Sequence, residues 1–141
     1  MNTNSSSLLD VQNLSIDFQT KDGVFHAAKD VSFSINKGET LSLIGESGSG
    51  KSITALSILK LLPYPMASHP SGKILYKGKD LLKIDDKGLR RVRGEEIGMI
   101  FQEPMTSLNP LQTIEKQIAE PMIVHEGMSQ KDARNRVKEL L

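Results

Sequence analysis

The sequence predicts an α/β fold in which antiparallel strands precede a unit of strand, glycine-rich loop and helix. Segments 8–18 and 24–35 are strand-like, and an Asp-Gly turn signal between them favours a hairpin. The run 41–44 is short and almost wholly apolar, which is typical of a strand buried on both faces. Glycine-rich residues 45–50 follow, and apolar residues then recur at helical spacing over 51–62. Together these observations indicate an α/β core with an antiparallel β subdomain in front of it.

The second half of the sequence predicts further strands and helices. Strands are expected at 72–76 and 97–101, which are short apolar runs. Helices are expected at 111–125, broken at Pro121, and over 129–141, where a Ser-x-x-Asp capping box opens an apolar stripe. This stripe is still running at the end of the sequence, without a capping glycine. We therefore expect the domain to continue beyond this sequence.

Composition excludes several classes of protein. The 141 residues suffice for one domain, expected at 8–141 after a disordered polar tail at 1–7. There are 18 Lys and Arg residues and 17 Asp and Glu residues, so a net charge of +1 offers no electrostatic support for nucleic-acid binding. The absence of cysteine excludes disulfides, Cys-ligated zinc and thiol catalysis. No apolar run approaches the length of about 20 residues that crosses a membrane, and we expect no secretory signal.

Residues 45–52 fit the phosphate-loop pattern G-x-x-x-x-G-K-[ST], and they lie between an expected strand and an expected helix. Glycine lets the backbone wrap closely around an anion, and successive N–H groups then bind phosphate oxygens. Lys51 places a cation on the β- and γ-phosphates, and the Ser52 hydroxyl is the expected magnesium ligand. The pattern predicts a purine nucleotide and Mg²⁺ as ligands, held by Gly45, Glu46, Ser47, Gly48, Ser49, Gly50, Lys51, Ser52 and Ile53.

The phosphate loop alone does not choose a reaction, because kinases, GTPases and motor ATPases share it. The sequence F-Q-E-P-M-T-S-L-N-P at 101–110 narrows the choice among these classes of protein. Together with G-E-S-G-S-G-K-S at 45–52, it resembles the Q-loop and Walker A motif of ATP-binding cassette (ABC) transporter ATPases. The two motifs are similar to those in the ATPase subunits of dipeptide, oligopeptide and nickel importers. The resemblance covers nearly the whole chain from Leu8 onward and implies a phosphate-loop NTPase fold of the ABC type.

The resemblance also implies roles for individual residues. Gln102 approaches magnesium and the attacking water, so Gln102 and Lys51 are the expected catalytic residues, and Ser52 and Gln102 are the expected metal ligands. A neutral amide suits this position because it coordinates through its oxygen without changing the charge of the site. Phe18 is the aromatic residue that the resemblance implies stacks on adenine. Phe25 is a weaker rival for that role, and a place for Phe18 in the core is the alternative.

For the whole protein, the resemblance implies an ATPase that energises import of peptides or a related small solute, nickel included. It implies a peripheral subunit at the cytoplasmic face of the membrane. The implied partners are transmembrane permease subunits, a second ATPase subunit and, indirectly, a solute-binding protein. The family's signature motif, Walker B carboxylates and switch histidine do not follow Gln102 in this sequence. The chain is therefore expected to bind ATP and Mg²⁺ without hydrolysing ATP.

Three alternatives remain open on the sequence alone. An ABC ATPase that acts outside transport is the first, and an inserted Q-loop region or a tandem cassette would favour it. A phosphate-loop kinase is the second, and it requires an acceptor site and an Arg-rich lid. The third is a complete short protein that binds nucleotide as a regulatory module. Mg-ATP binding that is unchanged by Lys51→Ala would exclude all three together with the transporter interpretation.

Overall fold

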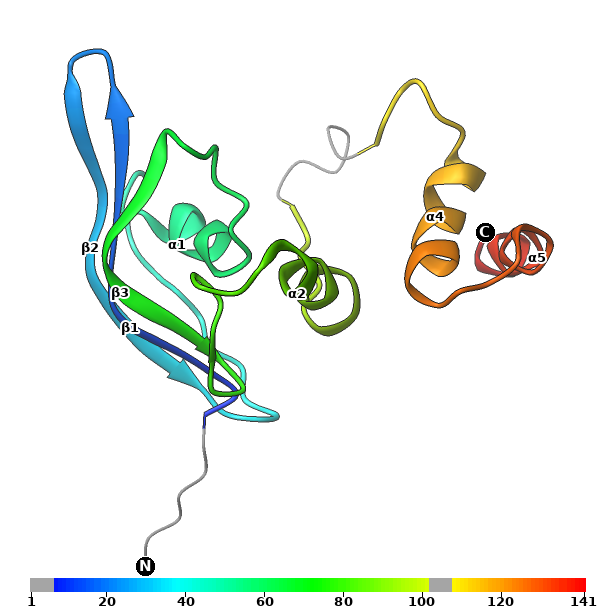
Figure 1. Cartoon of the computed structure of the whole chain (residues 1–141), viewed down its shortest axis with the longest axis horizontal. Helices are drawn as coiled ribbons and strands as arrows, with labels where there is room; N and C mark the ends of the chain where they lie inside the picture. Colours follow the sequence, from blue (N-terminus) through cyan, green and yellow to red (C-terminus); the bar gives the residue numbers. More distant parts are fainter. Residues whose placement is uncertain (1–6, 102–107) are drawn as a thin grey trace, which may run out of the picture. The chain divides into compact units, whose positions relative to one another are not determined.

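The computed structural model describes residues 7–101 and 108–141. The chain divides into two compact units, Met1–Leu89 and Arg90–Leu141. Figure 1 traces the elements along the chain. The elements in order are β1 (Leu9–Thr20), β2 (Gly23–Ile35), α1 (Lys51–Ile58), β3 (Ala67–Tyr76), β4 (Lys79–Asp80), α2 (Asp86–Arg91), the π-helical turn η1 (Val92–Glu96), α4 (Ile114–His125) and α5 (Gln130–Leu140).

The sheet of the first unit is antiparallel, with the strand order β2-β1-β3-β4 in the part of the chain that the structure describes. The predicted hairpin is confirmed, because β1 pairs with β2 from Leu9 opposite Ile35 to Thr20 opposite Gly23. The predicted strand at 72–76 is longer than expected and begins at Ala67. The extra residues join the strand because they pair with the outer end of β1, where Phe18 lies opposite Ala67. This non-local pairing leaves no signal in the local sequence.

The core of the first unit lies between this sheet and α1, which Figure 1 shows on one side of the strands. Alternate residues of β1 point into the core because successive side chains of a strand leave opposite faces. Ile16 and Leu14 of β1 are fully buried, as are Ile74 of β3 and Ser57 of α1. The Ser57 hydroxyl donates to the carbonyl of Ile53, which satisfies a polar group in an apolar setting. The other buried apolar residues of this unit are Leu9, Val11, Ala27, Leu59, Leu62, Ala67, Tyr76, Leu81 and Leu89.

The helix expected over 51–62 ends at Ile58, earlier than predicted. Lys60 takes a left-handed conformation with φ of 49°. The amide of Leu61 donates to the carbonyl of Leu56 at 2.9 Å, and the amide of Lys60 donates to the carbonyl of Ser57 at 3.0 Å. This is the Schellman pattern of helix termination, for which glycine is the usual residue. The prediction was wrong because a lysine occupies the position at which the sequence signal requires glycine.

Two predicted strands are absent from the described part of the chain. Neither 41–44 nor 97–101 is assigned to a strand, and the sheet there contains only β1 to β4. The run 41–44 is instead exposed, with Ile44 at 94% of full accessibility, and in 97–101 Ile100 is 99% exposed while Ile97 and Met99 are half-buried. A strand forms by hydrogen bonding to a neighbouring strand, so an apolar run without such a neighbour stays irregular. The apolar pattern therefore predicted burial that these residues do not have here.

The second unit contains two packed helices, α4 and α5. Ala119 of α4 is buried against Ala133 and Val137 of α5, with Ile118, Met122, Ile123 and Met128 around them. The predicted break at Pro121 is wrong, because α4 runs through this residue to His125. Proline removes one helical hydrogen bond, and the apolar contacts on either side of Pro121 keep the helix on α5. The helices predicted at 111–125 and 129–141 are otherwise confirmed, with bounds moved by a few residues.

Ser129 caps the start of α5 as predicted, although Asp132 contacts the Ser129 hydroxyl and not, as in a full capping box, the Ser129 amide. The Ser129 hydroxyl accepts from the Asp132 amide at 3.2 Å and donates to the Asp132 carboxylate at 2.7 Å. Ser129→Ala removes both bonds, so we expect the free energy of unfolding to fall by about 1 kcal/mol. Urea unfolding followed by helical circular dichroism measures this loss. Ser129→Asn is the control, since asparagine also caps helices, and equal losses in the two variants would contradict the capping role.

A histidine in β3 predicts a pH dependence of stability. The Nε2 atom of His69 lies 2.6 Å from the Tyr64 hydroxyl. Burial lowers the pKa of His69 below its ordinary value of 6.5, the Ser15 backbone acts in the opposite direction, and the charge of Lys60 lowers this pKa further. With a lowered pKa, the folded chain binds fewer protons than the unfolded chain just below pH 6.5. The contribution of His69 to stability is therefore complete above pH 6.5 and decreases as the pH falls below it.

Urea unfolding at pH 7.5 and at pH 5.5 tests this dependence. We expect the wild-type chain to lose free energy of unfolding at the lower pH. His69→Gln removes the titrating ring and keeps a hydrogen-bonding side chain, so its loss is expected to be smaller. An equal loss in the variant would assign the pH dependence to other groups.

Candidate nucleotide-binding site

The phosphate loop lies between the irregular run 41–44 and helix α1, all within the first unit. Gly50, the residue before the helix, has φ of 85°, a conformation that side chains rarely adopt. It is buried, and a Cβ atom added there would lie 2.6 Å from the carbonyl oxygen of Ala27 in β2. Only glycine fits between the helix and this strand. Gly50 therefore sets how closely the loop and the start of α1 approach the sheet.

The Lys51 side chain folds back over the loop. Its Nζ atom donates to the carbonyls of Gly45 at 2.7 Å and Glu46 at 2.6 Å, and to the hydroxyl of Ser49 at 3.2 Å. A lysine ammonium has three donors and no acceptor, so these contacts use its full capacity. They hold a positive charge over the loop backbone. A phosphate group that entered the loop would meet this charge directly.

The start of α1 adds further donors to the loop. The first amides of a helix have no partner within the helix, and Gly50 has no side chain that could cap them. The amide of Thr54 already donates to the Gly50 carbonyl at 2.8 Å, so the amides before it are the available ones. Ser52, at the second position of the helix, is exposed and offers its hydroxyl. Backbone amides, an ammonium and a hydroxyl form a donor set that fits a phosphate chain with its magnesium ion.

The remaining predicted site residues differ in their exposure, and one of them lies outside the described residues. Phe18 is half-buried in β1, opposite Phe25 of β2 and Ala67 of β3. Glu46, Ser47, Gly48 and Ser49 are exposed in the loop, and Ile53 is half-buried in α1. Gln102, the expected catalytic and metal-binding residue, lies outside the described residues.

The part of β2 that supports the loop could not be predicted from the sequence. Ala27 and Ala28 lie directly beneath Gly50, and a Cβ atom added to Gly50 would be 3.3 Å from the Cβ atom of Ala28. Small side chains are required there because larger ones would push the loop away from the sheet. Two adjacent alanines are common in protein sequences, so this pair does not by itself predict a contact with the phosphate loop. Their role follows only from the contact between segments that are distant in the sequence.

Among the described residues, no second site is as clearly formed as the phosphate loop. No group of three or more His, Cys, Asp or Glu side chains is placed to hold a metal ion in the described ranges. A groove between α4 and α5 is lined by both acidic and basic residues, among them Glu115, Lys116, Glu120 and Arg134. None of the helices in residues 7–101 and 108–141 has the length and apolar character needed to cross a membrane.

Comparison with known proteins decides the family. A family model described as ABC transporter matches residues 28–141. The chain belongs to the ABC transporter family. Over 139 residues it is 57% identical to the peptidoglycan transport ATP-binding protein YejF of Agrobacterium fabrum, covering 99% of this chain and 26% of that protein. Over 134 residues it is 50% identical to the oligopeptide transport ATP-binding protein OppD of Bacillus subtilis, covering 95% of this chain and 37% of that protein.

Solved ABC structures share the fold of this chain. The bacterial ABC transporter cassette MJ0796, solved as a dimer, matches with a TM-score of 0.75 at 28% identity, over 93% of this chain and 54% of that chain. The same cassette has been solved with ADP and Pi bound. CbiO1 of Clostridium perfringens, part of the transporter complex cbiONQ, matches with a TM-score of 0.64 at 27% identity, over 94% and 48% of the two chains. The predicted fold, an ABC-type phosphate-loop fold that is only partly present, is thus confirmed.

This ABC chain matches only part of the length of its relatives. It spans between about a quarter and two-fifths of the length of the curated relatives that it matches. Several of these relatives have names that refer to peptides, including the dipeptide transport ATP-binding protein DppD of Bacillus subtilis, which is 48% identical over 134 residues.

Proposed function

We propose that this chain binds Mg-ATP in its phosphate loop. The observation that carries the proposal is the Lys51 ammonium, held over the loop by the carbonyls of Gly45 and Glu46 and the hydroxyl of Ser49. Lys51 would contact the β- and γ-phosphates, and Ser52 would be a magnesium ligand. Gln102 is proposed as the second magnesium ligand and, with Lys51, as a catalytic residue of the whole protein. Bound magnesium would supply charge neutralisation between the phosphates.

We propose further that the whole protein energises the import of peptides or related small solutes. The names of the relatives support this, since they refer to oligopeptides, dipeptides and peptidoglycan. The proposed partners are membrane permease subunits and a second ATPase subunit, and the solved cassette dimer supports the latter. A solute-binding protein would act indirectly. The protein would then work peripherally, at the cytoplasmic face of the membrane. Nickel is the alternative solute.

We propose that residues 8–141 supply the N-terminal part of an ABC ATPase domain. The apolar runs 41–44 and 97–101 support this, because both have the composition of buried strands but pair with no strand in the described part of the chain. The signature motif and the Walker B carboxylates would come from other residues of the whole protein. This chain by itself would then bind ATP without hydrolysing it. The intact mass of the protein isolated from its own cells tests this: a mass near 15.5 kDa would contradict it.

Uptake assays test the proposed transport. In cells that carry the whole protein, Lys51→Ala should abolish ATP-dependent uptake of a labelled oligopeptide while the amount of protein stays normal. Uptake of radioactive nickel in the same cells discriminates the alternative solute. If Lys51→Ala abolishes nickel uptake and leaves peptide uptake unchanged, the transported solute is nickel and not a peptide. Unchanged uptake of both solutes would contradict the proposed function.

A further inference from the structure

The connection between α1 and β3, residues 59–66, is anchored in the first unit at both of its ends. At its start Leu59 is buried in the core. At its end the carbonyl of Met66 accepts from the amide of Gln19 in β1 at 2.8 Å. Between these ends lies Tyr64, which is 40% exposed. The contacts of the Tyr64 side chain therefore influence whether the middle of the connection stays against the sheet.

The Tyr64 side chain contacts a histidine near the start of β3. Its hydroxyl lies 2.6 Å from the Nε2 atom of His69, and the two ring centroids are 5.9 Å apart. Lys60, at the beginning of the same connection, places its Nζ atom 6.0 Å from the centre of the Tyr64 ring. These three side chains join the connection to the sheet. We call Lys60, Tyr64 and His69 the His69 cluster.

The His69 cluster favours a neutral imidazole ring. Burial lowers the pKa of His69, the Ser15 backbone of β1 acts in the opposite direction, and the positive charge of Lys60 lowers this pKa further. The carboxylate of Asp17, which pairs with the residue before His69, contacts the ring of His26 in β2 at 2.8 Å instead. A proton on His69 is therefore bound more weakly while the cluster is closed than when the ring is in water.

We propose that the His69 cluster is a pH-sensitive latch that holds the connection 59–66 against the sheet and releases it when His69 takes up a proton from solvent. In the open state the ring and the Tyr64 hydroxyl separate, and water solvates both. The preference for the closed state is complete above pH 6.5 and decreases as the pH falls below this value. Helix α1 begins at the phosphate loop and ends at this connection, so the latch acts at the far end of that helix. The latch does not depend on the proposed binding of ATP.

Hydrogen exchange of backbone amides, followed by NMR at pH 7.5 and at pH 5.5, tests the latch. The amide of Ala67 donates to the carbonyl of Pro63 at 2.9 Å, and the amide of Gln19 donates to that of Met66, so both amides report on the connection. The amide of Leu81, which donates to a carbonyl near the other end of β3 at 2.8 Å, is the internal reference. Protection is corrected for the intrinsic effect of pH on exchange.

The protection of Ala67 and Gln19 should fall about 2- to 10-fold at pH 5.5 relative to that of Leu81. The upper value applies to a ring that stays neutral as long as the connection is closed. His69→Gln keeps a hydrogen-bonding side chain that does not titrate, so this relative fall should disappear. His26→Gln is the matched control, because it removes a histidine of the same sheet that lies outside the cluster. It should behave like the wild type.

Three results would overturn the latch. Equal falls at Ala67 and Leu81 would mean that the whole unit opens rather than the connection. A relative fall that persists in His69→Gln, or that is lost in His26→Gln, would assign the effect to another group. Should His69→Gln fail to fold, Tyr64→Phe decides the question, because it removes only the hydroxyl. Its Ala67 protection is expected to be lower than that of the wild type already at pH 7.5, and unchanged protection would contradict the latch.

Discussion

Replacing Lys51 by alanine is expected to weaken Mg-ATP binding about 10- to 100-fold, because hydrogen bonds to charged groups are the strong ones. The Lys51 ammonium is positioned over the loop by three acceptors, and some of these hydrogen bonds would be exchanged for bonds to phosphate oxygens when phosphates enter. Removal of the side chain takes away the positive charge next to the phosphate loop. The backbone amides at the start of α1 remain, so weak binding should persist.

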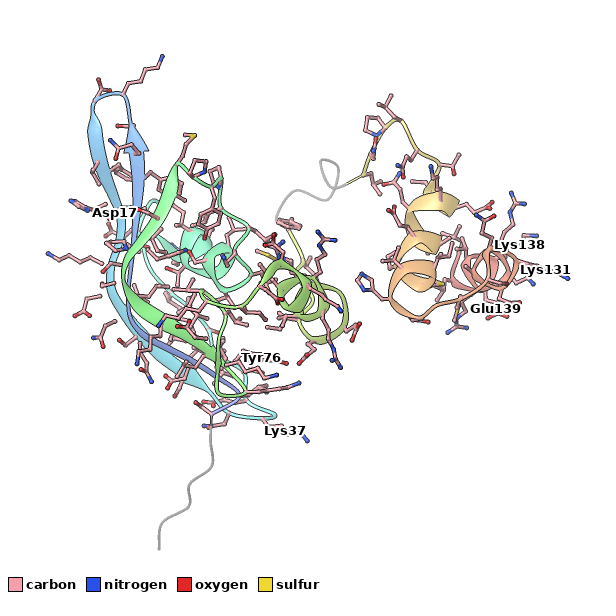
Figure 2. The ribbon with its side chains drawn as sticks, viewed as in Figure 1. Asp17, Lys37, Tyr76, Lys131, Lys138 and Glu139 are labelled. Carbon is pink, nitrogen blue, oxygen red and sulfur yellow. The ribbon has the colours of Figure 1, made fainter. Side chains whose placement is uncertain are left out.

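The measurement is a titration of the wild-type chain and of the Lys51→Ala variant with Mg-ATP. Lys37→Ala is the control, because it removes the same charge from the turn that follows β2, where Figure 2 labels Lys37. The control should bind ATP like the wild type. Circular dichroism should show that both variants keep their secondary structure. Equal affinities for wild type and Lys51→Ala would place the nucleotide elsewhere.

Gly72→Ala is expected to lower the free energy of unfolding by about 3 kcal/mol or more. Gly72 has φ of 95°, which costs an alanine about 1–2 kcal/mol. A Cβ atom at this position would also lie 2.5 Å from the Cα atom of Leu14 and 2.6 Å from the carbonyl oxygens of Gln12 and Asn13. These atoms belong to the backbone of the central strand β1 and cannot rotate away. The overlap would force β3 away from β1, at a further cost of about 1–3 kcal/mol.

Gly78→Ala is the matched control for this prediction. Gly78 has φ of 78°, and nothing lies within 4 Å of an added Cβ atom. It therefore carries the conformational cost without the overlap, and we expect a loss of about 1 kcal/mol. Urea unfolding compares the two variants with the wild type. Equal losses at Gly72 and Gly78 would contradict the account of how β3 packs on β1.

Local signals in the sequence predicted those parts of the fold that local interactions form. The Asp22-Gly23 dipeptide predicted the hairpin, and β1 and β2 do meet at Thr20 and Gly23. Ser129 and Asp132 predicted the start of α5, and their hydrogen bonds are formed. In each case the residues that carry the signal also make the contact. The phosphate loop belongs to the same class, since its glycines and lysine lie within eight consecutive residues.

The two strand predictions that were wrong depended on distant partners. The run 41–44 has the composition of a buried strand, but composition does not state whether a neighbouring strand is present. The run 97–101 was mistaken for a strand for the same reason. The extension of β3 to Ala67 was missed because it depends on its pairing with Phe18. Strand assignment from sequence therefore failed where hydrogen bonds cross between segments.

The candidate site likewise has a part that the sequence motif predicts and a part that depends on contacts between distant segments. Residues 45–52 were predictable as a motif, but the hydrogen bonds of Lys51 to the carbonyls of Gly45 and Glu46 were not predicted. The pairing of Phe18 with Phe25 depends on the register of the hairpin, which is set where Thr20 lies opposite Gly23. The sequence therefore presented the two phenylalanines as rivals, whereas the register places them on one face. The role of Gln102 stays a prediction.

Backbone NMR of the ¹⁵N-labelled chain during titration with Mg-ATP tests the central claim most directly. The account predicts saturable shifts of the amide signals of Gly48, Ser49, Gly50, Lys51, Ser52 and Ile53, because these N–H groups would bind phosphate oxygens. The amide signals of α4 and α5 should not move to a comparable extent. Shifts confined to those two helices, or no shifts at the phosphate loop at saturating Mg-ATP, would contradict the account.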